Sequence, residues 1–400
     1  MSVRVLETSS EIEKLRDLWT SWPGARDSDL DFFLFIAGIR SEVLSPHVLL
    51  AYRGEIPDAM LVGRLEQRTI PIKFGYINLR SPRIRVLDLI HGGLRGNATR
   101  ENVELLVRNV LKSLRQGEID LAIFEHLRVD SLLYEVVRAL SRGIERGVPR
   151  ERTTHRYLEL PENSEDLYKI LPPEHRQNYR RKGRKLVKDF SGDVSIKCYD
   201  STRDLDLIFR EIETIARKTY QRGLGFGFAD TPEMRGRFEL AAFKGWLRVF
   251  ILYVGGKPVA YWTATAYSGM LCGDQVGYDP EFRRYSPGMY LSLNKLGDMC
   301  DHKESHKITQ VDYGIGDAEY KSLLSNRCYE EEDVLIYGRT LRGIGINTIS
   351  TPVLLADRFA KRMLAKSNLL VRAKRFWRDR ATRAQGQQPT SDKQGPPAES

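Results

Sequence analysis

The stretch Tyr278–Leu296, YDPEFRRYSPGMYLSLNKL, joins a strand-like segment to a helix and carries an anion-binding pattern. Arg283 and Arg284 precede Ser286-Pro287-Gly288, and the apolar residues that follow recur every three or four positions. The first turn of a helix has unpaired N–H groups, its dipole adds positive potential, and glycine lets a phosphate approach closely. The stretch therefore predicts a phosphate-binding helix start, although a capped helix with solvated arginines has the same pattern.

The segments around this stretch alternate between strand and helix patterns across the second half of the chain. Gly255-Gly256 marks a hairpin turn, and Thr231 before Pro232 marks a helix start. The expected elements are a strand at 194–199, helices at 204–220 and 232–243, strands within 249–267 and at 270–278, the helix after Pro287, a strand at 308–314, a short helix at 319–324 and a strand at 334–338.

The first half repeats this order of elements with negligible sequence identity. Its expected elements are a strand at 3–7, helices at 11–19 and 31–39, a hairpin at 47–65, further strands to Leu89, a helix at 101–114, a strand at 119–126, a helix at 131–140 and a strand at 156–160. A chain of 400 residues is long enough for two such units. The pattern predicts an α/β (mixed α+β) fold of two tandem domains.

The positive charge is concentrated in two segments. Residues 176–188 hold seven Lys or Arg and no acid, and residues 357–383 hold ten against two acids, out of a net charge of +10. The rest of the chain is therefore mildly acidic, at about −5. Any contact with a polyanion or a membrane should involve these two segments.

Cysteine usage and apolar runs indicate a cytoplasmic protein. The four cysteines form no C-x-x-C pair, which argues against a zinc ribbon or a disulfide framework. The amino terminus lacks the apolar core of a signal peptide, and the longest apolar run, Phe32–Ile39, is too short to cross a bilayer.

The last part of the chain is expected to form a basic helix and then a disordered end. Apolar residues of the helix fall near one face, at Leu355, Phe359, Met363, Leu370 and Trp377. This face suits peripheral contact with an anionic membrane surface, and packing on the core explains it equally well. The final residues are poor in apolar side chains and are expected to be disordered.

Two motifs of the second half resemble a known family. YDPEFRRYSPG before a helix, with VDYGIGDAEYK at Val311–Lys321, resembles the tandem GNAT acyltransferases of the CelD-like group, associated with exopolysaccharide or cellulose biosynthesis and related in fold to FemAB peptidyltransferases. The resemblance covers Leu171–Gly338 and implies GNAT-like domains, each a mixed, mostly antiparallel sheet with helices on both faces. The expected organisation is a degenerate GNAT-like domain at 1–165, a basic connector at 166–190, a GNAT acyltransferase domain at 191–345, a basic amphipathic helical tail at 346–384 and a disordered end at 385–400.

By this resemblance, the turn Ser286–Met289 replaces the pyrophosphate loop of GNAT enzymes and binds acetyl-CoA or another acyl-coenzyme A as co-substrate. The implied cofactor-binding residues are Arg283, Arg284, Ser286, Gly288 and Met289. The turn departs from the family pattern because it has one glycine where several are typical.

Acyl transfer from a thioester needs a base for the attacking group, donors for the oxyanion and an acid for the thiolate. The resemblance implies that Tyr320 is the general acid, and Asp312, at the end of the preceding strand, is the better of the available bases. The residues expected to contact substrate are Gly316, Asp317 and Lys321. The open alternatives are that Asp312 caps the turn at 314–316, that Tyr320 is ordinary packing, and that Asp317 and Lys321 form a surface ion pair.

Two further features of the sequence carry weaker signals. His302 and His306 are four residues apart, but we find no acidic or thiol partner at a fitting spacing, so no metal is expected. The glycine-rich segment at 220–231 suits either a movable acceptor loop or a plain connector.

Three functions remain open at this point. The leading one is an N- or O-acyltransferase acting on a sugar or cell-envelope precursor. The second is a FemAB-like peptidyltransferase that uses aminoacyl-tRNA, although the sequence shows no long helical insertion. The third is a non-catalytic scaffold for RNA or anionic lipid, in which binding depends steeply on salt; for the leading function a nucleic-acid partner is not expected.

Overall fold

The computed structural model describes residues 1–74, 77–141, 145–219, 227–316 and 318–366. A single twelve-stranded sheet runs through both halves of the chain in the order β1-β2-β3-β6-β7-β14-β8-β13-β12-β11-β10-β9. Its strands are β1 Ser2–Leu6, β2 Val43–Arg53, β3 Ile56–Arg68, β6 Ile84–Gly96, β7 Leu121–Arg128, β8 Thr153–Glu159, β9 Val194–Tyr199, β10 Leu247–Val254, β11 Lys257–Tyr267, β12 Met270–Tyr278, β13 Gln310–Ile315 and β14 Arg327–Tyr337. A separate hairpin consists of β4 Pro71–Phe74 and β5 Ile77–Arg80.

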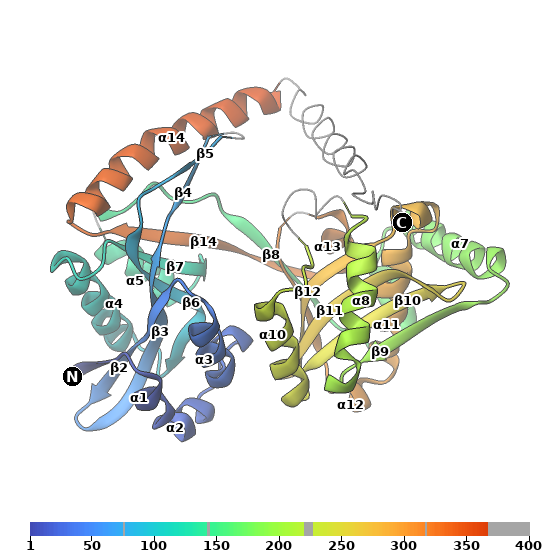
Figure 1. Ribbon diagram of the computed structural model, residues 1–400, viewed down its shortest axis with the longest axis horizontal. Helices are drawn as coiled ribbons and strands as arrows, with labels where there is room; N and C mark the ends of the chain where they lie inside the picture. The colour runs from blue at the N-terminus through green and yellow to red at the C-terminus, as the bar shows by residue number, and fades with distance from the viewer. Residues whose placement is uncertain (75–76, 142–144, 220–226, 317, 367–400) are drawn as a thin grey trace, which may run out of the picture.

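Helices flank this sheet in both lobes (Figure 1). They are α1 Ser9–Glu13, α2 Arg16–Ser21, α3 Leu30–Ile39, α4 Arg100–Arg115, α5 Leu132–Leu140, α6 Ser164–Ile170, α7 Pro173–Asp189, α8 Leu205–Ala216, α10 Pro232–Phe243, α11 Pro287–Asp301, α12 Lys303–His306, α13 Glu319–Leu324 and α14 Leu341–Lys366. Short 3-10 turns are η1 Arg26–Ser28, η3 Thr202–Asp204 and η4 Pro280–Tyr285.

Alternating side chains of the central strands build a core on each face of the sheet. In β2, Leu49 packs into the cluster under α4 and α5, whereas Leu50 packs into the cluster under α1–α3. In β10, Phe250 faces α11 and Ile251 faces α8 and α10. This is the period of two that a strand imposes on its side chains. The fold is therefore mixed α/β with helices on both faces, as predicted.

The two halves exchange strands where they meet. β8, from the first half, lies between β14 and β13, and β14, from the second half, lies between β7 and β8. Figure 1 shows β8 and β14 as long strands that connect the two lobes. As a result, every side chain on these two strands sits near residues that are far away in sequence.

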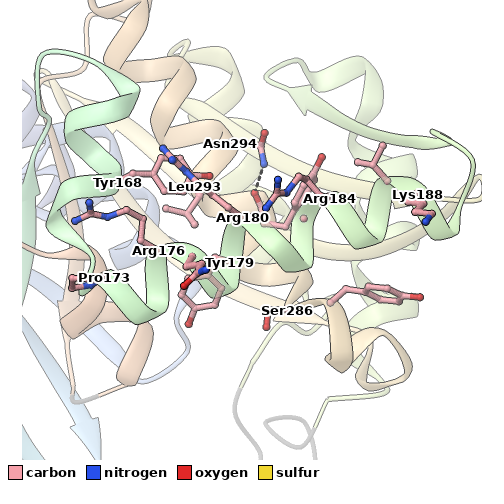
Figure 2. Close-up of a pocket in the computed structure, with 15 residues that line it drawn as sticks. Tyr168, Pro173, Arg176, Tyr179, Arg180, Arg184, Lys188, Ser286, Leu293 and Asn294 are labelled. Carbon is pink, nitrogen blue, oxygen red and sulfur yellow. Dashed lines mark hydrogen bonds between the residues drawn. The ribbon is translucent and has the colours of Figure 1, made fainter.

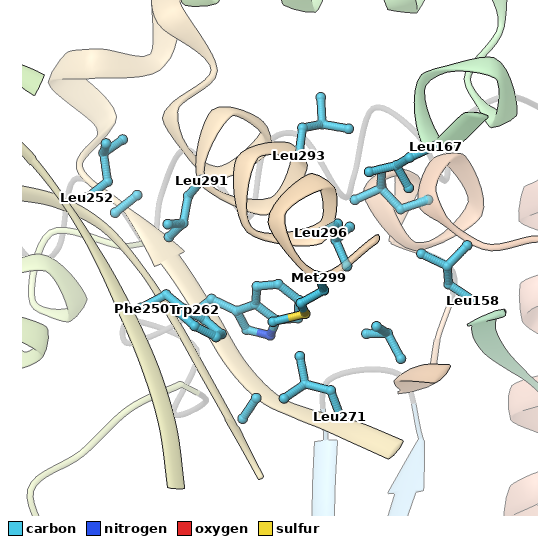
Figure 3. Packing of buried hydrophobic residues seen from close by; sticks show 14 of the residues in the cluster. Leu158, Leu167, Phe250, Leu252, Trp262, Leu271, Leu291, Leu293, Leu296 and Met299 are labelled. Atoms are coloured by element: carbon cyan, nitrogen blue, oxygen red, sulfur yellow. The ribbon is translucent and has the colours of Figure 1, made fainter. Parts of the chain in front are cut away.

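The hydrophobic cores follow the same exchange. Leu158 of β8 is fully buried in the second-half core with Leu296, Met299 and Trp262 (Figure 3). Conversely, Ile336 of β14 is fully buried in the first-half core. Full burial of such a side chain contributes about 1.5–3 kcal/mol, so each core depends on the strand it receives from the other half.

The predicted order of elements is confirmed in both halves, with local differences. The helix expected at 11–19 is divided into α1 and α2, because the chain leaves α1 at the cap residue Lys14. β6 continues beyond Leu89 as far as Gly96. The tail helix starts before residue 346, at Leu341, and packs against β4 and β14.

No helix among the described residues combines the length and the apolar character needed to cross a membrane. The part of the tail beyond residue 366 and the segment 220–226 of the glycine-rich connector lie outside the described residues.

Candidate functional site

The start of α11 keeps the geometry expected of an anion-binding turn. Ser286 adopts a left-handed conformation, φ 51°, directly before Pro287, and its side chain makes no capping hydrogen bond. The first hydrogen bond within the helix is donated by the N–H of Tyr290 to the carbonyl of Ser286, at 3.0 Å. The N–H groups of Gly288 and Met289 precede it and therefore have no acceptor inside the helix. A Cβ added to Gly288 would meet only the ring of Tyr278, at 3.8 Å, so the turn has open space beside it.

The two arginines of this motif do not line the large cleft next to the turn. Arg284 donates to the hydroxyl of Tyr285 at 2.5 Å, and that hydroxyl donates to Asp189 of α7 at 2.8 Å. Arg283 is exposed on η4. Cations at the cleft come from α7 instead, and Lys182 donates to the Ser286 hydroxyl at 2.9 Å.

The α7–α11 cleft is a groove of about 850 Å³ between these two helices, with Ser286 at its wall. Its basic side chains follow one another along α7 (Figure 2): Arg176, Arg180, Arg184 and Lys188. Arg180 is held by Glu165 at 2.7 Å, whereas Arg184 and Lys188 form no ion pair within the described part of the chain. Two cations are therefore available to an anionic ligand at this cleft.

Strands β12 and β13 lie side by side only at their beginnings. Their parallel pairing runs from Met270 and Gln310 to Cys272 and Asp312, and no pairing continues beyond it in the described residues. β12 also shifts register against β11 after Gly273, which leaves Asp274 unpaired in a bulge. The strands separate here and leave a space in the sheet.

A small cavity of about 50 Å³, the Tyr320 cavity, lies where the strands separate. It is lined by Trp262, Gly273, Asp274, Gln275, Val276, Ser292, Tyr313, Tyr320 and Lys321. The half-buried ring of Tyr320 meets the ring of Tyr313 edge-on, with the ring centroids 6.3 Å apart. Lys321 donates to the carbonyl of Ile315 at 2.6 Å, and burial lowers the pKa of its ammonium group.

The turn before α13 is tied to the first half of the chain. Gly316, at φ 110°, donates its N–H to the carbonyl of Thr154 on β8, at 3.2 Å. Asp317 lies outside the described residues. Of the predicted residues, Tyr320 and Lys321 line the same cavity. Gly316 links the turn that precedes them to β8.

Asp312 is held by two hydrogen bonds to the same carboxylate oxygen. Oδ1 accepts from Nε2 of His155 at 2.6 Å and from the N–H of Gly314 at 2.6 Å. Burial acts to raise the pKa of this carboxyl group, but the hydrogen bond and charge of His155 and the Gly314 amide outweigh it and lower the pKa. Asp312 thus caps its turn, and a lowered pKa makes it a weaker proton acceptor.

A second, larger cavity of about 570 Å³, the inter-half cavity, begins on the other side of Gly273. Its polar lining includes His91 of β6, His126 of β7, His155 of β8, Asp312 of β13, and Tyr329 and Glu331 of β14. A Cβ added to Gly273 would lie 3.2 Å from both the Asp312 carbonyl oxygen and Trp262 Nε1. Gly273 lines both this cavity and the Tyr320 cavity.

His155 is the charged centre of the inter-half cavity. Its Nε2 contacts Asp312 at 2.6 Å and its Nδ1 lies 3.1 Å from Glu331, while its ring stacks on Tyr329 with centroids 4.6 Å apart. Burial opposes the charge on the ring, but the hydrogen bonds that the ring donates to Asp312 and Glu331, together with the charges of both carboxylates, raise the pKa of His155 to about 9. The imidazole is therefore protonated at neutral pH.

Sequence reasoning missed the three histidines because it examined each half separately. The available signal was that His91 and His126 each end an apolar strand segment of the first half. The other noted pair, His302 and His306, contacts Asp298 at 3.2 and 3.4 Å, so the expectation that they lack an acidic partner was wrong. No group of three or more potential metal ligands occurs in the described ranges.

Residues 173–322, from α7 into α13, match the family model of the acetyltransferase (GNAT) domain. The chain superposes on the crystal structure of FemX with a TM-score of 0.54 and 11% identity, covering 88% of this chain and 100% of FemX. A C-terminal domain of a putative lysylphosphatidylglycerol synthetase from Agrobacterium fabrum superposes with a TM-score of 0.49 and 11% identity, covering 87% of this chain and 98% of that one. A tandem GNAT protein from the clavulanic acid biosynthesis pathway superposes with a TM-score of 0.47 and 11% identity, covering 85% of this chain and 100% of that one. A sequence search of curated proteins found no match. Residues 173–322 are thus similar to the GNAT acetyltransferase domain, and the FemX likeness concerns the fold.

Proposed function

We propose that this protein is an N- or O-acyltransferase that moves an acyl group from acyl-coenzyme A to an amine or hydroxyl of a sugar or cell-envelope precursor, as in exopolysaccharide biosynthesis. The observation that carries the proposal is the separation of β12 and β13 beside Tyr320, within the range 173–322 that matches the GNAT domain. A separated pair of strands exposes backbone N–H groups and leaves room for a narrow chain. The CelD-like assignment remains part of this proposal.

In this proposal the donor's phosphates bind at the start of α11. The N–H groups of Gly288 and Met289 and the cations of α7 supply the positive potential there. Ser286 is held by Lys182 at 2.9 Å, which brings a further ammonium group to the turn. The thioester arm then extends toward the Tyr320 cavity, which Ser292 of α11 also lines.

The chemical step requires little more than correct placement. The acceptor attacks the thioester carbon, backbone N–H groups at the separated strands stabilise the oxyanion, and the C–S bond breaks. The leaving thiolate takes the hydroxyl proton of Tyr320. Asp312 orients its turn and His155 through the hydrogen bonds described above, and its assignment as base remains a proposal.

The test is a Tyr320→Phe protein assayed with acetyl-coenzyme A. We expect turnover to fall about 10²–10⁴-fold, the usual contribution of general acid catalysis, while donor affinity measured by calorimetry stays unchanged. Tyr253→Phe, at the distant β9–β10 edge, is the matched control. Full turnover by the Tyr320 variant would refute the assigned acid.

A second candidate is aminoacyl-tRNA-dependent transfer, as in FemAB-type enzymes. The observation that favours it is the row of cations in the α7–α11 cleft, with Arg184 and Lys188 free of ion pairs in the described residues. Calorimetry with acetyl-coenzyme A and filter binding with aminoacyl-tRNA decide between the two. Binding of coenzyme A without tRNA supports the first function, and the reverse result supports the second.

We also propose a cytoplasmic protein with peripheral contact between α14 and an anionic membrane. Leu355 is 51% exposed and Phe359 is 68% exposed on this helix, whereas Ile346 is buried. Apolar side chains that remain uncovered beside a basic segment suit an anionic lipid surface.

A further inference from the structure

The residue that forms the bulge of β12, Asp274, is held by its side chain rather than by the sheet. The pairing of β12 with β11 passes from Gly273 directly to Gln275, and its pairing with β13 has ended before this point in the described residues. Oδ1 of Asp274 accepts a hydrogen bond from Arg26 Nη1 at 2.6 Å, and Oδ2 accepts one from the Thr265 hydroxyl at 3.1 Å. Because both carboxylate oxygens are held, they determine how the bulge is oriented.

The cation in this arrangement comes from the other half of the chain. Arg26, on η1, is 248 residues away from Asp274 in sequence, and within the described ranges it is the one ion-pair partner of that carboxylate. Asp27 Oδ1 lies 3.1 Å from both Nε and Nη2 of the same guanidinium, and the centroid of the Phe32 ring lies 5.6 Å from its central carbon. The planar group is therefore fixed along one edge and presents its remaining nitrogen to β12.

The turn that carries Arg26 is anchored to the body of the first half. Ser28, the last residue of η1, is fully buried, and the turn packs against β6. Arg95 of β6, 4% exposed, donates to the Ser28 carbonyl at 2.9 Å and to the Trp19 carbonyl at 2.8 Å. The indole N–H of Trp19 donates to the same Ser28 carbonyl at 2.9 Å. Buried hydrogen bonds of this kind rigidify a segment, so η1 is a firm support for the guanidinium.

The ion pair itself is only partly buried, which separates its local effect from the stability of the fold. The side chain of Arg26 is 18% exposed and that of Asp274 is 34% exposed. Partly exposed ion pairs contribute little to the free energy of unfolding. The exchanged strands β8 and β14 hold the two halves together independently of this pair. Loss of the pair should therefore release the bulge without unfolding the protein.

We propose that Arg26 is a positioning residue for the acyl transfer: by holding Asp274 it fixes the bulge of β12 and keeps β12 and β13 apart beside Tyr320. This inference rests on the proposed acyltransferase function and gives the first half a part in it. Asp274 lines the Tyr320 cavity, whereas Arg26 does not, so Arg26 acts through Asp274. All residues that line this cavity belong to the second half, and the first half determines its shape from outside.

The first test is kinetic and uses the full-length protein, with thiol release from acetyl-coenzyme A measured in the presence of glucosamine or glucose. We expect Arg26→Ala to lower kcat about 10–100-fold, because a displacement of about 1 Å at a reacting centre can cost 10², and to change KM for acetyl-coenzyme A little. Arg26→Lys keeps the charge without the planar fork, so it should recover part of the lost turnover. The matched control is Arg53→Ala, which breaks an ion pair with Asp58 in the first half and should leave kcat unchanged.

A double variant tests whether Arg26 acts through Asp274. If it does, Arg26→Ala combined with Asp274→Ala loses no more turnover than Arg26→Ala alone, because both changes remove the same interaction. Losses that multiply in the double variant reveal two independent effects and contradict the inference. Equal kcat in Arg26→Ala and the wild type also contradicts it.

A spectroscopic measurement follows the bulge without any turnover. Trp262 lines the Tyr320 cavity, and a Cβ added to Gly273 would lie 3.2 Å from its indole Nε1. The chain has five tryptophans, so their indole N–H signals can be resolved by NMR, and that of Trp262 can be assigned with Trp262→Phe. Arg26→Ala should shift this signal, and Arg53→Ala should leave it in place. An unmoved signal in Arg26→Ala overturns the inference even where kcat falls.

The wild-type protein separates this inference from the proposed function. If it neither releases thiol from acetyl-coenzyme A nor binds it in calorimetry, the acyltransferase proposal fails and the positioning role fails with it. If the wild type is active and Arg26→Ala is equally active, the positioning role alone fails.

Discussion

The α7–α11 cleft and the inter-half cavity are built in opposite ways. The cleft is basic and comes from two helices of one half, with lining residues between 168 and 294. The cavity has an acidic floor and takes its lining from both halves, between residues 24 and 331. The comparison shows that one cavity is built by neighbouring segments of one half, whereas the other exists only because the two halves exchange strands.

The largest expected effect comes from filling the space beside Gly273, which lines both the Tyr320 cavity and the inter-half cavity. Gly273→Val places a branched side chain where even a Cβ lies 3.2 Å from Trp262 Nε1 and the Asp312 carbonyl. We expect turnover to fall about 10²–10³-fold, because a displacement of about 1 Å at a reacting centre can cost 10². Steady-state kinetics with acetyl-coenzyme A checks this.

The control for this change is Gly345→Ala on α14, where nothing lies within 4 Å of an added Cβ. Thermal unfolding of both proteins separates a blocked site from a damaged fold. Normal turnover by a folded Gly273→Val protein contradicts a role for the space beside this residue in the proposed acyl transfer.

The basic side of the comparison is tested by reversing charge in the cleft. The double change Arg184→Glu and Lys188→Glu should weaken acetyl-coenzyme A binding by about 10–100-fold, because two charge-assisted contacts are replaced by repulsion. The matched control is Arg181→Glu with Lys185→Glu, the same charge change on α7 outside the cleft lining. Calorimetry at low and high salt measures both. If the two double variants lose equal affinity for acetyl-coenzyme A, the total charge of α7 determines binding and the position of the cations in the cleft does not.

The acidic side is tested through the pH dependence of stability. The pKa of His155 is raised from 6.5 to about 9 in the folded protein. The charged imidazole therefore stabilises the fold fully below pH 6.5, and this stabilisation is lost as the pH rises through about 9. The free energy of unfolding should decrease over that interval by roughly 3 kcal/mol. In His155→Asn this decrease should disappear, and His175→Asn on α7 should retain it.

Denaturant unfolding at pH 6, 7.5 and 9.5 measures this effect. Asp312 has the opposite pH dependence, because its pKa is lowered in the folded protein. Its carboxylate stabilises the fold at a pH above the pKa of the unfolded chain, and this stabilisation is lost as the pH falls through the folded pKa. A wild-type curve that is flat between pH 6.5 and 9 contradicts a charged His155 shared by two carboxylates.

The sequence predicted the features that depend on neighbouring residues and missed those that depend on contacts between the two halves. The helix start at Pro287, its apolar spacing and the turn before it are local, and the sequence predicted them because the preference of proline for the first helical position and apolar periodicity act over a few residues. The order of strands and helices was predictable for the same reason. The alternation of β2 and β10 side chains likewise needs only the period of two.

The inter-half cavity could not be predicted in this way. His155 and Asp312 are 157 residues apart, and they meet only because β8 pairs with β13 in the other half. A pattern that treats the halves as separate units assigns β14 to the second core, whereas Ile336 is buried in the first. The bulge that gives His126 its left-handed backbone depends on β14 as well. No window of local sequence contains that information.

The smallest expected effect concerns a third surface, the exposed apolar residues of α14. Leu355→Asp with Phe359→Asp should reduce co-sedimentation with vesicles containing anionic lipid by a few-fold, because a side chain that only touches the lipid surface contributes a small part of the about 1.5–3 kcal/mol that full burial gives. Leu341→Asp, 93% exposed at the start of the same helix but distant from the basic segment, is the control. Vesicles of neutral lipid separate apolar insertion from charge attraction. If the double variant sediments like the wild type, these residues face water, and the basic charges beyond them would have to account for any membrane contact alone.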